Sequence, residues 1–596
     1  MKTLTDRLTQ ELQAAFAAAG YETDGIRAVL SNRPDLCEYQ CNGAMPLAKT
    51  AHKAPIVIAQ EAAAYLTDSE VLSEAEAVKP GFLNLKLKES FLADFLQEMA
   101  ADEKLGARTF EGSEAKTIVM DYGGPNVAKP LHVGHLRSAV IGESIKRILR
   151  YAGHTVISDV HLGDWGLQMG LIITELSHRQ PDLPYFDPDY EGDYPAEAPF
   201  TVSELEEIYP TASAKSKEDP SYKEAALEAT AQLQAGRRGY AALLDHILNV
   251  SVTDLKRNYE NLNVSFDLWY GESDAQKYVP EMIDDMIAGG WARESEGALV
   301  VDIAEEGDKK ELPPCIVRKS DGASLYATTD LATLVQRERD FHPDEVIYVV
   351  DKRQSLHFTQ VFRTAKKTGI VPQETQLVFK GFGTMNGKGG KPFKTREGGV
   401  MRLETLMDEI NAEMFRKIEE NYTAHGKEAP DRKEAMATAK IVGLSALKYG
   451  DLSNQASKDY VFDIDRFTSF EGNTGPYILY TMVRIKSILS KYRTTVAQEL
   501  PVRISPTGNE AARGLMLELV KWNTVIAEAV EETAPHKICA FLYDLSNAFN
   551  HFYHETPVLG EEDAAKRDSY IALIALVLRA LETGIDLLGF SAPDKM

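Results

Sequence analysis

A segment at residues 124–138 combines side chains that can hold phosphate groups with the predicted start of a helix. It contains the histidines His132 and His135, the intervening Gly134 and, just upstream, the cation Lys129. Backbone N–H groups in the first turn of a helix lack intrahelical acceptors and lie at the positive end of the helix dipole, so they stabilise an anion. The histidines add hydrogen-bond donors and the lysine adds charge. The segment therefore predicts a phosphate-binding loop.

The elements that position this loop can be predicted from residue spacing. β-branched and apolar residues at 117–122 predict a strand before it, and apolar residues at helical spacing from Leu136 to Leu149 predict a helix after it. Gly153 is expected to end that helix in the left-handed conformation. The loop is thus placed between a strand and a helix.

The His-x-x-His spacing is weak evidence without this context, because short patterns recur by chance. A second pair, His551 and His554, has the same spacing but lies in an aromatic segment without a glycine or a strand-to-helix junction. We interpret that second pair as part of a helix surface.

Strand and helix patterns alternate after the loop, with further strands expected at 155–160, 345–350 and 376–379. This alternation predicts an α/β fold with a doubly wound, mostly parallel sheet, and such sheets bind ligands at the carboxyl ends of their strands. A polar stretch from about 180 to 255, rich in Pro, Asp, Glu and Ala, interrupts the pattern. We interpret it as an insertion in which 223–247 is helical.

The sequence on either side of this sheet predicts two further domains. Residues 1–113 combine an N-terminal helix with short strands, which predicts a small α+β domain that ends in the linker 111–113. From residue 401 onward strand patterns nearly vanish, and amphipathic segments predict an all-α helical bundle. The clearest of these segments are 435–449, 477–492, 515–530 and 570–588.

The chain has the composition of an ordinary globular protein, with 596 residues of which 44% are hydrophobic and 26% charged. A net charge of −25 argues against a protein that coats DNA or RNA non-specifically, although local basic patches can still bind a shaped RNA. No signal peptide and no apolar run of about 18 residues is present, so we expect a cytoplasmic protein without a membrane partner. The four cysteines include one close pair, Cys37 and Cys41, and no second pair beside it, so we expect no structural zinc.

The pattern Asn-x-Ala-Lys-x-x-His-x-Gly-His at 126–135 resembles the HIGH signature of the class I aminoacyl-tRNA synthetases. The surrounding sequence is most similar to the arginyl-tRNA synthetase family, with further family motifs in the same order at 163–168, 270–273, 326–331, 354–358, 394–399 and 470–477. The resemblance covers roughly residues 30–596, and the joint occurrence of these motifs is far more specific than any one of them.

This resemblance implies the fold and the roles of the domains. It implies a Rossmann-like catalytic domain of the HUP type at 114–400, with insertions near 172–255 and 274–324. It also implies that the N-terminal additional domain at 1–113 contacts the elbow, or D-loop, of a tRNA and that the helical domain at 401–596 binds the anticodon.

The resemblance also implies the reaction and its partners. L-Arginine and ATP would give arginyl-adenylate and pyrophosphate, after which arginine is transferred to the 2′-hydroxyl of the 3′-terminal adenosine of tRNA(Arg), with release of AMP, for protein synthesis. Mg²⁺ would be carried by the nucleotide, with no other metal. The enzyme would act as a monomer in the cytoplasm, and its activation step would require the cognate tRNA.

By the same resemblance, His132, Gly134, His135 and Gly383 bind ATP. Charge builds on the phosphates during adenylate formation, so the site needs hydrogen-bond donors and cations in fixed places. We expect His132 and His135 to donate hydrogen bonds to the phosphates, and Gly134 to leave room for the adenine.

The second ATP motif of the family, KMSKS, is degenerate in this chain. The segment 387–397 contains the glycines and cations of that motif, but the usual second lysine has no clear counterpart. Family members with this departure are thought to use a lysine just ahead of the HIGH histidines, and Lys129 occupies that place. We therefore assign phosphate stabilisation to Lys129, with Lys391 and Lys394 as alternative catalytic lysines.

Five residues match the family positions that bind arginine. A guanidinium is planar and permanently charged, so carboxylates aligned with its N–H groups recognise it best, and Glu272 and Asp330 match these positions. Tyr326 lies one helical turn before Asp330 and is expected to pack against the arginine side chain. Asn126 and Gln354 are expected to hold the α-amino and carboxylate end. Two buried acids would reject neutral amino acids, because their charges would be left unpaired.

Further positions match family contacts with tRNA. Unstacked bases are commonly read by stacking on aromatic side chains. The expected tRNA-binding residues are Phe82 and Asn84 in the N-terminal domain and Tyr477, Tyr480, Tyr553 and Met596 in the helical domain.

Three other interpretations compete with this one. A small-molecule nucleotidyltransferase would share the loop and the sheet, but it would leave the helical and N-terminal domains without a purpose. A catalytically silent RNA-binding relative of a synthetase is disfavoured by the intact His132, His135, Asn126 and Asp330. A zinc hydrolase that uses the two histidines would need a third ligand, and no HExxH pattern is present.

Overall fold

The computed structural model describes residues 1–596 apart from 321–324, 392–400 and 425–430. The described residues form two compact units. The sheet unit comprises 110–416 and 450–467, and the terminal unit comprises 1–109, 417–449 and 468–596.

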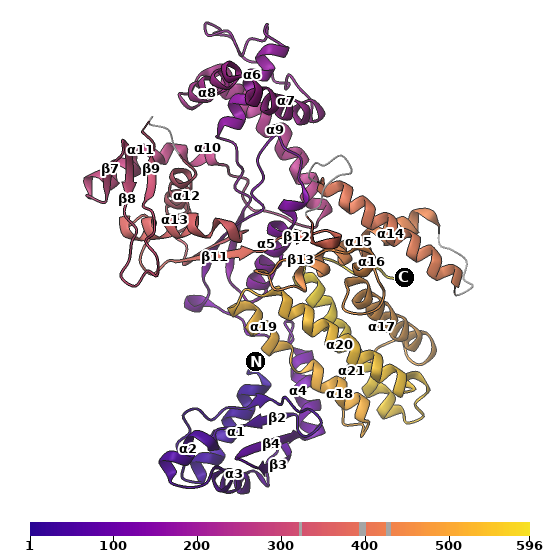
Figure 1. Cartoon of the computed structure of the whole chain (residues 1–596). Coiled ribbons are helices and arrows are strands. Elements are labelled where there is room, and N and C mark those ends of the chain that lie inside the picture. Colours follow the sequence, from indigo (N-terminus) through magenta and orange to yellow (C-terminus); the bar gives the residue numbers. More distant parts are fainter. Residues whose placement is uncertain (321–324, 392–400, 425–430) are drawn as a thin grey trace. The chain divides into compact units, whose positions relative to one another are not determined.

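The sheet unit is built on four parallel strands in the order β11–β10–β5–β6 (Figure 1). These are β5 (Thr117–Tyr122), β6 (Thr155–Asp159), β10 (Glu345–Asp351) and β11 (Gln376–Phe382), which confirms the four predicted strands. Their apolar residues, such as Val119 and Ile347, are fully buried, as expected for a parallel sheet covered on both faces. The strand order reverses between β5 and β10, and open sheets of this kind bind ligands at that switch point.

Helix α5 (Val133–Tyr151) follows β5 and packs against β5, β6 and β10. It begins before the predicted start near Leu136, because His132 caps the helix with its side chain. Gly153 has a φ of 97° and follows the end of the helix in the left-handed conformation, as predicted. The remaining elements around the sheet are α6 (Leu167–Arg179), α12 (Tyr326–Phe341), α13 (Ser355–Thr368), α16 (Ile464–Phe467), β12 (Met385–Asn386) and β13 (Tyr460–Val461).

Three helices follow α6 and form the first insertion, at the top of Figure 1. They are α7 (Val202–Glu218), α8 (Pro220–Gln234) and α9 (Arg238–Asn261). The predicted helical segment 223–247 is in fact two helices, because Gly236 between them adopts a φ of 84°.

A second insertion follows after residue 271. It contains α10 (Glu272–Ala275), α11 (Val279–Ala288) and an antiparallel sheet of β7 (Ala292–Ser295), β8 (Ala298–Val301) and β9 (Cys315–Arg318). Met286 and Val301 from this insertion share one hydrophobic core with Val119 and Val346 of the main sheet. The second insertion is therefore packed firmly onto the sheet.

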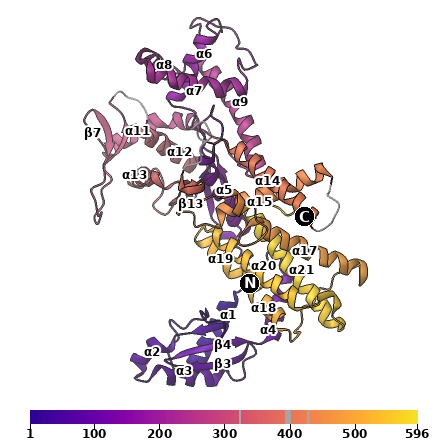
Figure 2. The same cartoon turned by 45° about the vertical axis from the view of Figure 1, so that its right-hand side comes forward.

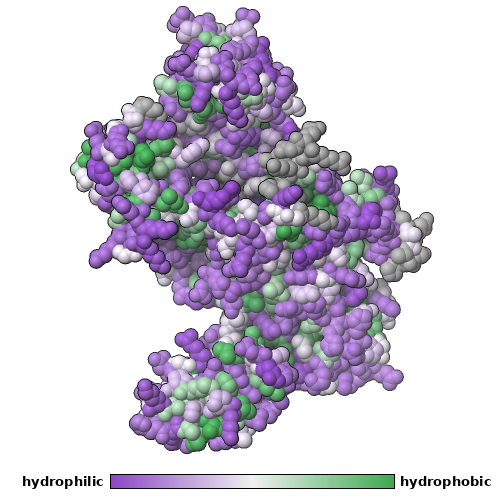
Figure 3. Space-filling model, in the orientation of Figure 1, coloured by the Kyte–Doolittle hydropathy of each residue, from purple (hydrophilic) through white to green (hydrophobic). Residues whose placement is uncertain are grey.

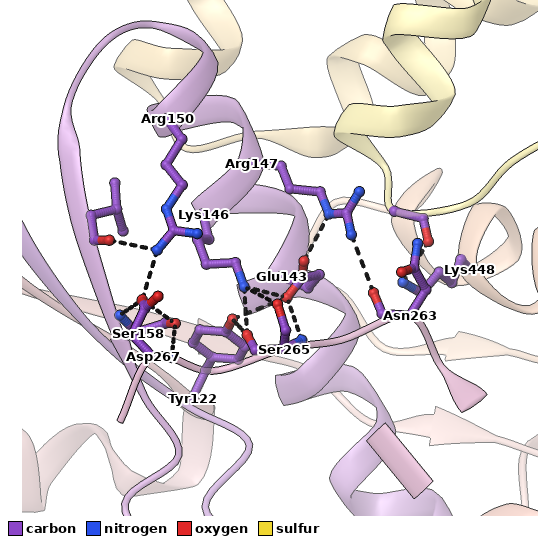
Figure 4. A network of polar contacts seen from close by, with 12 residues as sticks. Tyr122, Glu143, Lys146, Arg147, Arg150, Ser158, Asn263, Ser265, Asp267 and Lys448 are labelled. Carbon is purple, nitrogen blue, oxygen red and sulfur yellow. Dashed lines mark hydrogen bonds and ion pairs between the residues drawn. The ribbon is translucent and has the colours of Figure 1, made fainter. Parts of the chain in front are cut away.

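A buried polar network holds the segment 263–267 against α5 (Figure 4). The Nζ atom of Lys146 lies 2.7 Å from a carboxylate oxygen of Glu143 and donates to the Oγ atom of Ser265 at 3.1 Å. The hydroxyl of Tyr122 donates to the carbonyl oxygen of Ser265 at 3.1 Å. Burial lowers the pKa of Lys146, while the charge of Glu143 opposes that shift.

The chain continues from this network in an extended path beside residues 158–162. The N–H of Leu162 donates to the carbonyl oxygen of Tyr270 at 2.7 Å, and the N–H of Glu272 donates to the carbonyl oxygen of Leu162 at 3.0 Å. These bonds place Glu272 at the start of α10, on the carboxyl side of β6.

The terminal unit begins with an α+β domain, as predicted. Helix α1 (Leu4–Ala18) precedes an antiparallel sheet with the strand order β1–β2–β4–β3. Its elements are β1 (Val29–Leu30), β2 (Tyr39–Cys41), α2 (Ala44–Ala51), α3 (Pro55–Ala63), β3 (Leu72–Val78), β4 (Phe82–Leu87) and α4 (Glu89–Ala101).

The rest of the terminal unit is a bundle of helices (Figure 2). Helices α14 (Leu403–Ala424) and α15 (Arg432–Leu452) have residues in both units. They are followed by α17 (Gly475–Thr495), α18 (Glu510–Leu519), α19 (Trp522–Glu531), α20 (Pro535–Glu555) and α21 (Ala564–Leu587). The prediction of one helix at 515–530 is wrong, because α18 ends and α19 begins within it. His551 and His554 are exposed on α20, which agrees with a helix surface.

None of the described helices is both long and apolar enough to cross a membrane. On the face drawn in Figure 3, hydrophilic residues predominate and apolar residues form small separate groups.

Candidate active site

A cavity of about 390 Å³ lies at the carboxyl ends of β5, β10 and β11, next to the start of α5. It is therefore at the switch point of the sheet. His132, Gly134, His135 and Gly383 all line it, so the structure brings together the residues predicted to bind ATP, and Gln354 lines it as well. The other lining residues are Asp121, Tyr122, Gly123, Gly124, Val133, Arg137, Ser138, Val350, Asp351, Arg353, Phe382, Thr384 and Met385.

The two histidines lie at the first turn of α5 with their rings stacked at a centroid distance of 3.9 Å. The Nδ1 atom of His132 accepts a hydrogen bond from the N–H of Gly134 at 3.0 Å, and the Nδ1 atom of His135 accepts one from the N–H of His132 at 3.2 Å. A neutral imidazole whose Nδ1 atom accepts carries its single proton on Nε2. Each ring can therefore donate a hydrogen bond to a ligand from Nε2.

Both rings are neutral near pH 7. Burial lowers the pKa of His135 to about 3, and the neighbouring His132, whose protonation would compete, and the positive charge of Lys129 add to this effect. Burial also lowers the pKa of His132, and the charge of Lys129 lowers it further. The histidine pair therefore supplies neutral hydrogen-bond donors, and the positive charge beside it comes from Lys129.

Two glycines of the cavity lie so close to neighbouring atoms that a side chain would not fit at either position without a shift. A Cβ atom at Gly134 would lie 2.7 Å from Cε1 of His132, so a side chain here would displace the stacked ring. A Cβ atom at Gly383 would lie 2.5 Å from Oδ1 of Asp459 and from the backbone of Lys458. Both glycines therefore allow the close packing that forms the walls of the cavity.

Arg137 joins the start of α5 to the opposite wall of the cavity, and sequence reasoning missed this role. Its buried guanidinium donates to the carbonyl oxygens of Gly383 at 2.7 Å and Lys458 at 3.0 Å, and to the carboxylate of Asp451 at 3.0 Å. The spacing of the loop motif gives no sign of a partner 314 positions away.

The residues predicted to bind the guanidinium lie near one another. Burial raises the pKa of Glu272 to about 7; the charge of His161 lowers it, and the charges of Asp164 and Asp330 raise it. Tyr326 is 73% exposed, but partial desolvation and the charge of Glu272 still raise its pKa. The mutual influence of these groups indicates one acidic subsite.

Asp330 has a partner that sequence reasoning also missed. The Nε2 atom of His357 lies 2.5 Å from Oδ2 of Asp330, and both side chains are largely buried. His357 falls in the family motif at 354–358, but its spacing alone does not indicate contact with Asp330. The pair fixes the orientation of one carboxylate of the acidic subsite.

Asn126 lies in the loop that leaves β5. Its neighbours pair with Gly163, since the N–H of Val127 donates to the carbonyl oxygen of Gly163 at 3.1 Å and the N–H of Gly163 donates to the carbonyl oxygen of Pro125 at 3.1 Å. A Cβ atom at Gly163 would lie 2.3 Å from Oδ1 of Asn126, so this glycine makes room for the amide.

The three candidate lysines differ in their surroundings. The Nζ atom of Lys129 lies 4.5 Å from the centroid of the Tyr209 ring, and the charge of Lys129 lowers the pKa of both histidines. Lys391 is exposed. Lys394 lies outside the described residues.

The positions expected to contact tRNA are in the terminal unit. Phe82 is half-buried, whereas Asn84 is buried and its Oδ1 accepts from Gln40 at 2.8 Å. The guanidinium carbon of Arg484 lies 4.9 Å from the ring centroid of Tyr480 and 5.5 Å from that of Tyr553. The remaining two positions are half-buried: Tyr477, whose hydroxyl donates to Asn547 at 2.7 Å, and Met596.

Three family models match the sequence along almost its whole length. The model described as tRNA synthetases class I (R), catalytic domain, matches residues 96–464. The Arginyl tRNA synthetase N terminal domain matches 2–87, and the DALR anticodon binding domain matches 478–596.

Known proteins resemble the chain in sequence and in fold. It is 63% identical to the arginine–tRNA ligase of Agathobacter rectalis and 54% identical to that of Alkaliphilus oremlandii, with full coverage of both chains in each case. Among solved structures, the arginyl-tRNA synthetases of Plasmodium falciparum and Thermus thermophilus match all of the chain and are fully covered by it, with TM-scores of 0.81 and 0.76 at 22% and 24% identity. At that identity, the two structures show the fold alone.

Proposed function

The chain belongs to the arginyl-tRNA synthetase family, and on that basis we propose that the cavity at the end of β5 is where ATP and L-arginine react. The protein is an arginine–tRNA ligase, which uses ATP to charge tRNA with arginine. This assignment rests on the position of the cavity. The cavity lies at the switch point of the sheet, and it is lined by the two histidines at the start of α5 together with Gly383 and Gln354.

ATP activation requires the arginine carboxylate to attack the α-phosphate while pyrophosphate leaves. Negative charge then grows on the phosphates, and fixed donors stabilise it best. His132 and His135 donate from Nε2, and the start of α5 adds the positive end of the helix dipole. Lys129 supplies the charge, because its positive charge lowers the pKa of both rings; Lys391 and Lys394 are the alternatives for this role.

Magnesium would come with the nucleotide. Within the described part of the chain, no group of three or more His, Cys, Asp or Glu side chains is arranged to hold a metal ion. We propose that the phosphates of ATP are the main ligands of Mg²⁺, because Mg²⁺ is usually bound through substrate phosphates, and that the ion offsets part of their charge.

Arginine is recognised at both of its ends. Glu272 and Asp330 pair with the guanidinium, and Tyr326 covers the aliphatic part of the side chain. Asn126 and Gln354 hold the α-amino and carboxylate groups, with Gln354 placed in the wall of the ATP cavity. A neutral amino acid would leave the two acids unpaired, which disfavours its binding.

The terminal unit would bind the tRNA whose terminal adenosine accepts arginine at its 2′-hydroxyl. We assign the domains as 1–113 for the tRNA elbow, 114–400 for catalysis and 401–596 for the anticodon. Tyr477, Tyr480, Tyr553 and Met596 are the proposed anticodon contacts, and Phe82 and Asn84 the proposed elbow contacts. The chain would act as a monomer in the cytoplasm, and its free, buried cysteines fit a reducing compartment.

The division between ATP and arginine residues can be tested with two variants. Asp330→Asn should mainly raise the KM for arginine, whereas His135→Ala should mainly lower the rate of ATP–pyrophosphate exchange at saturating arginine. Asp284→Asn, at an exposed position of α11, is the matched control and should behave as the unaltered enzyme. Identical kinetic profiles for the first two variants would contradict the proposed roles.

A further inference from the structure

We propose that Tyr209 of α7 positions Lys129 for the phosphates, so that the first insertion completes the ATP site. This inference rests on the proposed role of Lys129. Tyr209 lies in a polar stretch that the sequence marks only as an insertion, and none of the family motifs includes it.

The ring of Tyr209 is held in place by its own insertion. It packs against a hydrophobic cluster from α6, α7 and α8 that contains Leu171, Ala212, Tyr222 and Ala226. The Nζ atom of Lys129 lies 4.5 Å from the centroid of this ring, within the range of a cation–π contact. The position of the lysine is therefore set by a side chain that cannot easily move.

The backbone that carries Lys129 is also tied to the insertion. Ala128 has a φ of 58°, a strained conformation for a residue with a side chain, and its N–H donates to Oγ of Ser251 on α9 at 3.0 Å. The carbonyl oxygen of Val127 accepts from Nε2 of Gln168 at the start of α6. Helices α6 and α9 thus stabilise the turn that precedes the lysine.

A second contact joins α7 to the segment that pairs with His132. Glu206 lies three positions before Tyr209, on the same helix face, and pairs with Arg402 at 3.1 Å. Arg402 lies opposite His132 in a short backbone pairing, in which the N–H of Val133 donates to the carbonyl oxygen of Met401 at 3.1 Å. One face of α7 therefore contacts both Lys129 and the segment that pairs with His132.

The contact with Tyr209 leaves Lys129 able to bind a phosphate. A cation–π contact uses the positive charge of the ammonium group, and the N–H groups that face away from the ring remain available as donors. Lys129 can therefore donate to a phosphate of ATP while it stays over the ring, which keeps its charge in place during the reaction.

The test compares Tyr209→Leu, Tyr209→Phe and Lys129→Met in ATP–pyrophosphate exchange with arginine and tRNA. Tyr209→Leu should lower kcat by roughly twofold to thirtyfold, the range that corresponds to one cation–π contact. Tyr209→Phe, which keeps the aromatic face, should stay within about twofold of the unaltered enzyme. In the Lys129→Met background, Tyr209→Leu should have no further effect. The KM for arginine should stay unchanged throughout, and an unchanged thermal unfolding temperature of each variant would separate this effect from a loss of folded enzyme.

Tyr240→Leu is the matched control, because it removes another ring of the same insertion that faces an arginine, Arg237, at 4.1 Å. It should leave the exchange rate unchanged. If Lys129→Met is fully active, the proposed role of Lys129 fails. If Lys129→Met is impaired but Tyr209→Leu is not, the role of Tyr209 fails while that of the lysine stands. A loss in Tyr209→Phe equal to that in Tyr209→Leu, or additive losses in the double variant, would also overturn the inference.

Discussion

The Nε2 atom of His357, in the first turn of α13, lies 2.5 Å from the Oδ2 atom of Asp330 on α12. This contact holds the carboxylate in one orientation, which matters because a guanidinium is recognised through aligned, planar contacts. The acidic subsite is therefore oriented before arginine arrives.

We expect His357→Ala to raise the KM for arginine about tenfold, because Asp330 loses a hydrogen bond to a charged group. The KM for ATP should change little, since His357 does not line the ATP cavity. His357→Gln retains a hydrogen-bond donor, so its KM for arginine should lie between those of the unaltered enzyme and of His357→Ala. Steady-state charging rates measure both constants, and an unchanged KM for arginine in the alanine variant would show that Asp330 does not depend on His357.

Glu272 should make arginine binding depend on pH. Burial raises its pKa to about 7, so the carboxyl is increasingly protonated below that pH in the empty site and cannot pair with the guanidinium. The KM for arginine should rise by about tenfold between pH 8 and pH 6 and should level off above pH 8.

The other groups that face Glu272 do not produce this profile. Burial lowers the pKa of His161, but the carboxylates of Asp159, whose Oδ2 lies 3.7 Å from the Nδ1 of His161, and of Asp121 outweigh that effect and raise it to about 9, so the imidazole stays protonated between pH 6 and 8. Burial raises the pKa of Asp164 and of Tyr326. Glu272→Gln should bind arginine weakly at every pH, and a pH-dependent KM that persists in this variant would assign the titration to another group.

Two glycines of α5 should respond differently to alanine. At Gly134 the added Cβ atom would meet the end of the His132 ring, which can move away, so Gly134→Ala should keep its stability but lower the exchange rate at least tenfold. At Gly142 it would lie 2.2 Å from the buried ring of Tyr122, so Gly142→Ala should lose about 1–3 kcal/mol of stability.

Thermal unfolding and pyrophosphate exchange separate these two effects. A large loss of stability in Gly134→Ala, or full activity in that variant, would mean that the stacked arrangement of the histidines does not depend on this glycine.

Much of the fold follows from local patterns. The four strands of the main sheet are predictable because buried parallel strands are continuous runs of branched apolar residues. Polar structure is harder to predict: α5 begins early because His132 caps it, and α7 carries too few apolar residues to be recognised. The break between α18 and α19 was missed because the apolar spacing continues across it.

The residues of the candidate site also differ in whether the sequence predicts them. The histidine loop is predictable because its residues are adjacent in sequence and their geometry depends on a local helix start. The contacts of Arg137 with Asp451 and of Lys129 with Tyr209 join distant segments, and no residue spacing predicts them. Such pairs depend on how distant segments of the chain fold back onto the sheet, which only the three-dimensional structure reveals.

The specificity of the cavity is tested most directly by ATP–pyrophosphate exchange with each of the twenty amino acids, with and without total tRNA. We predict exchange with arginine alone, and only when tRNA is present. Exchange with another amino acid, or no exchange under any condition, would contradict the assignment of this cavity as the site of arginine activation.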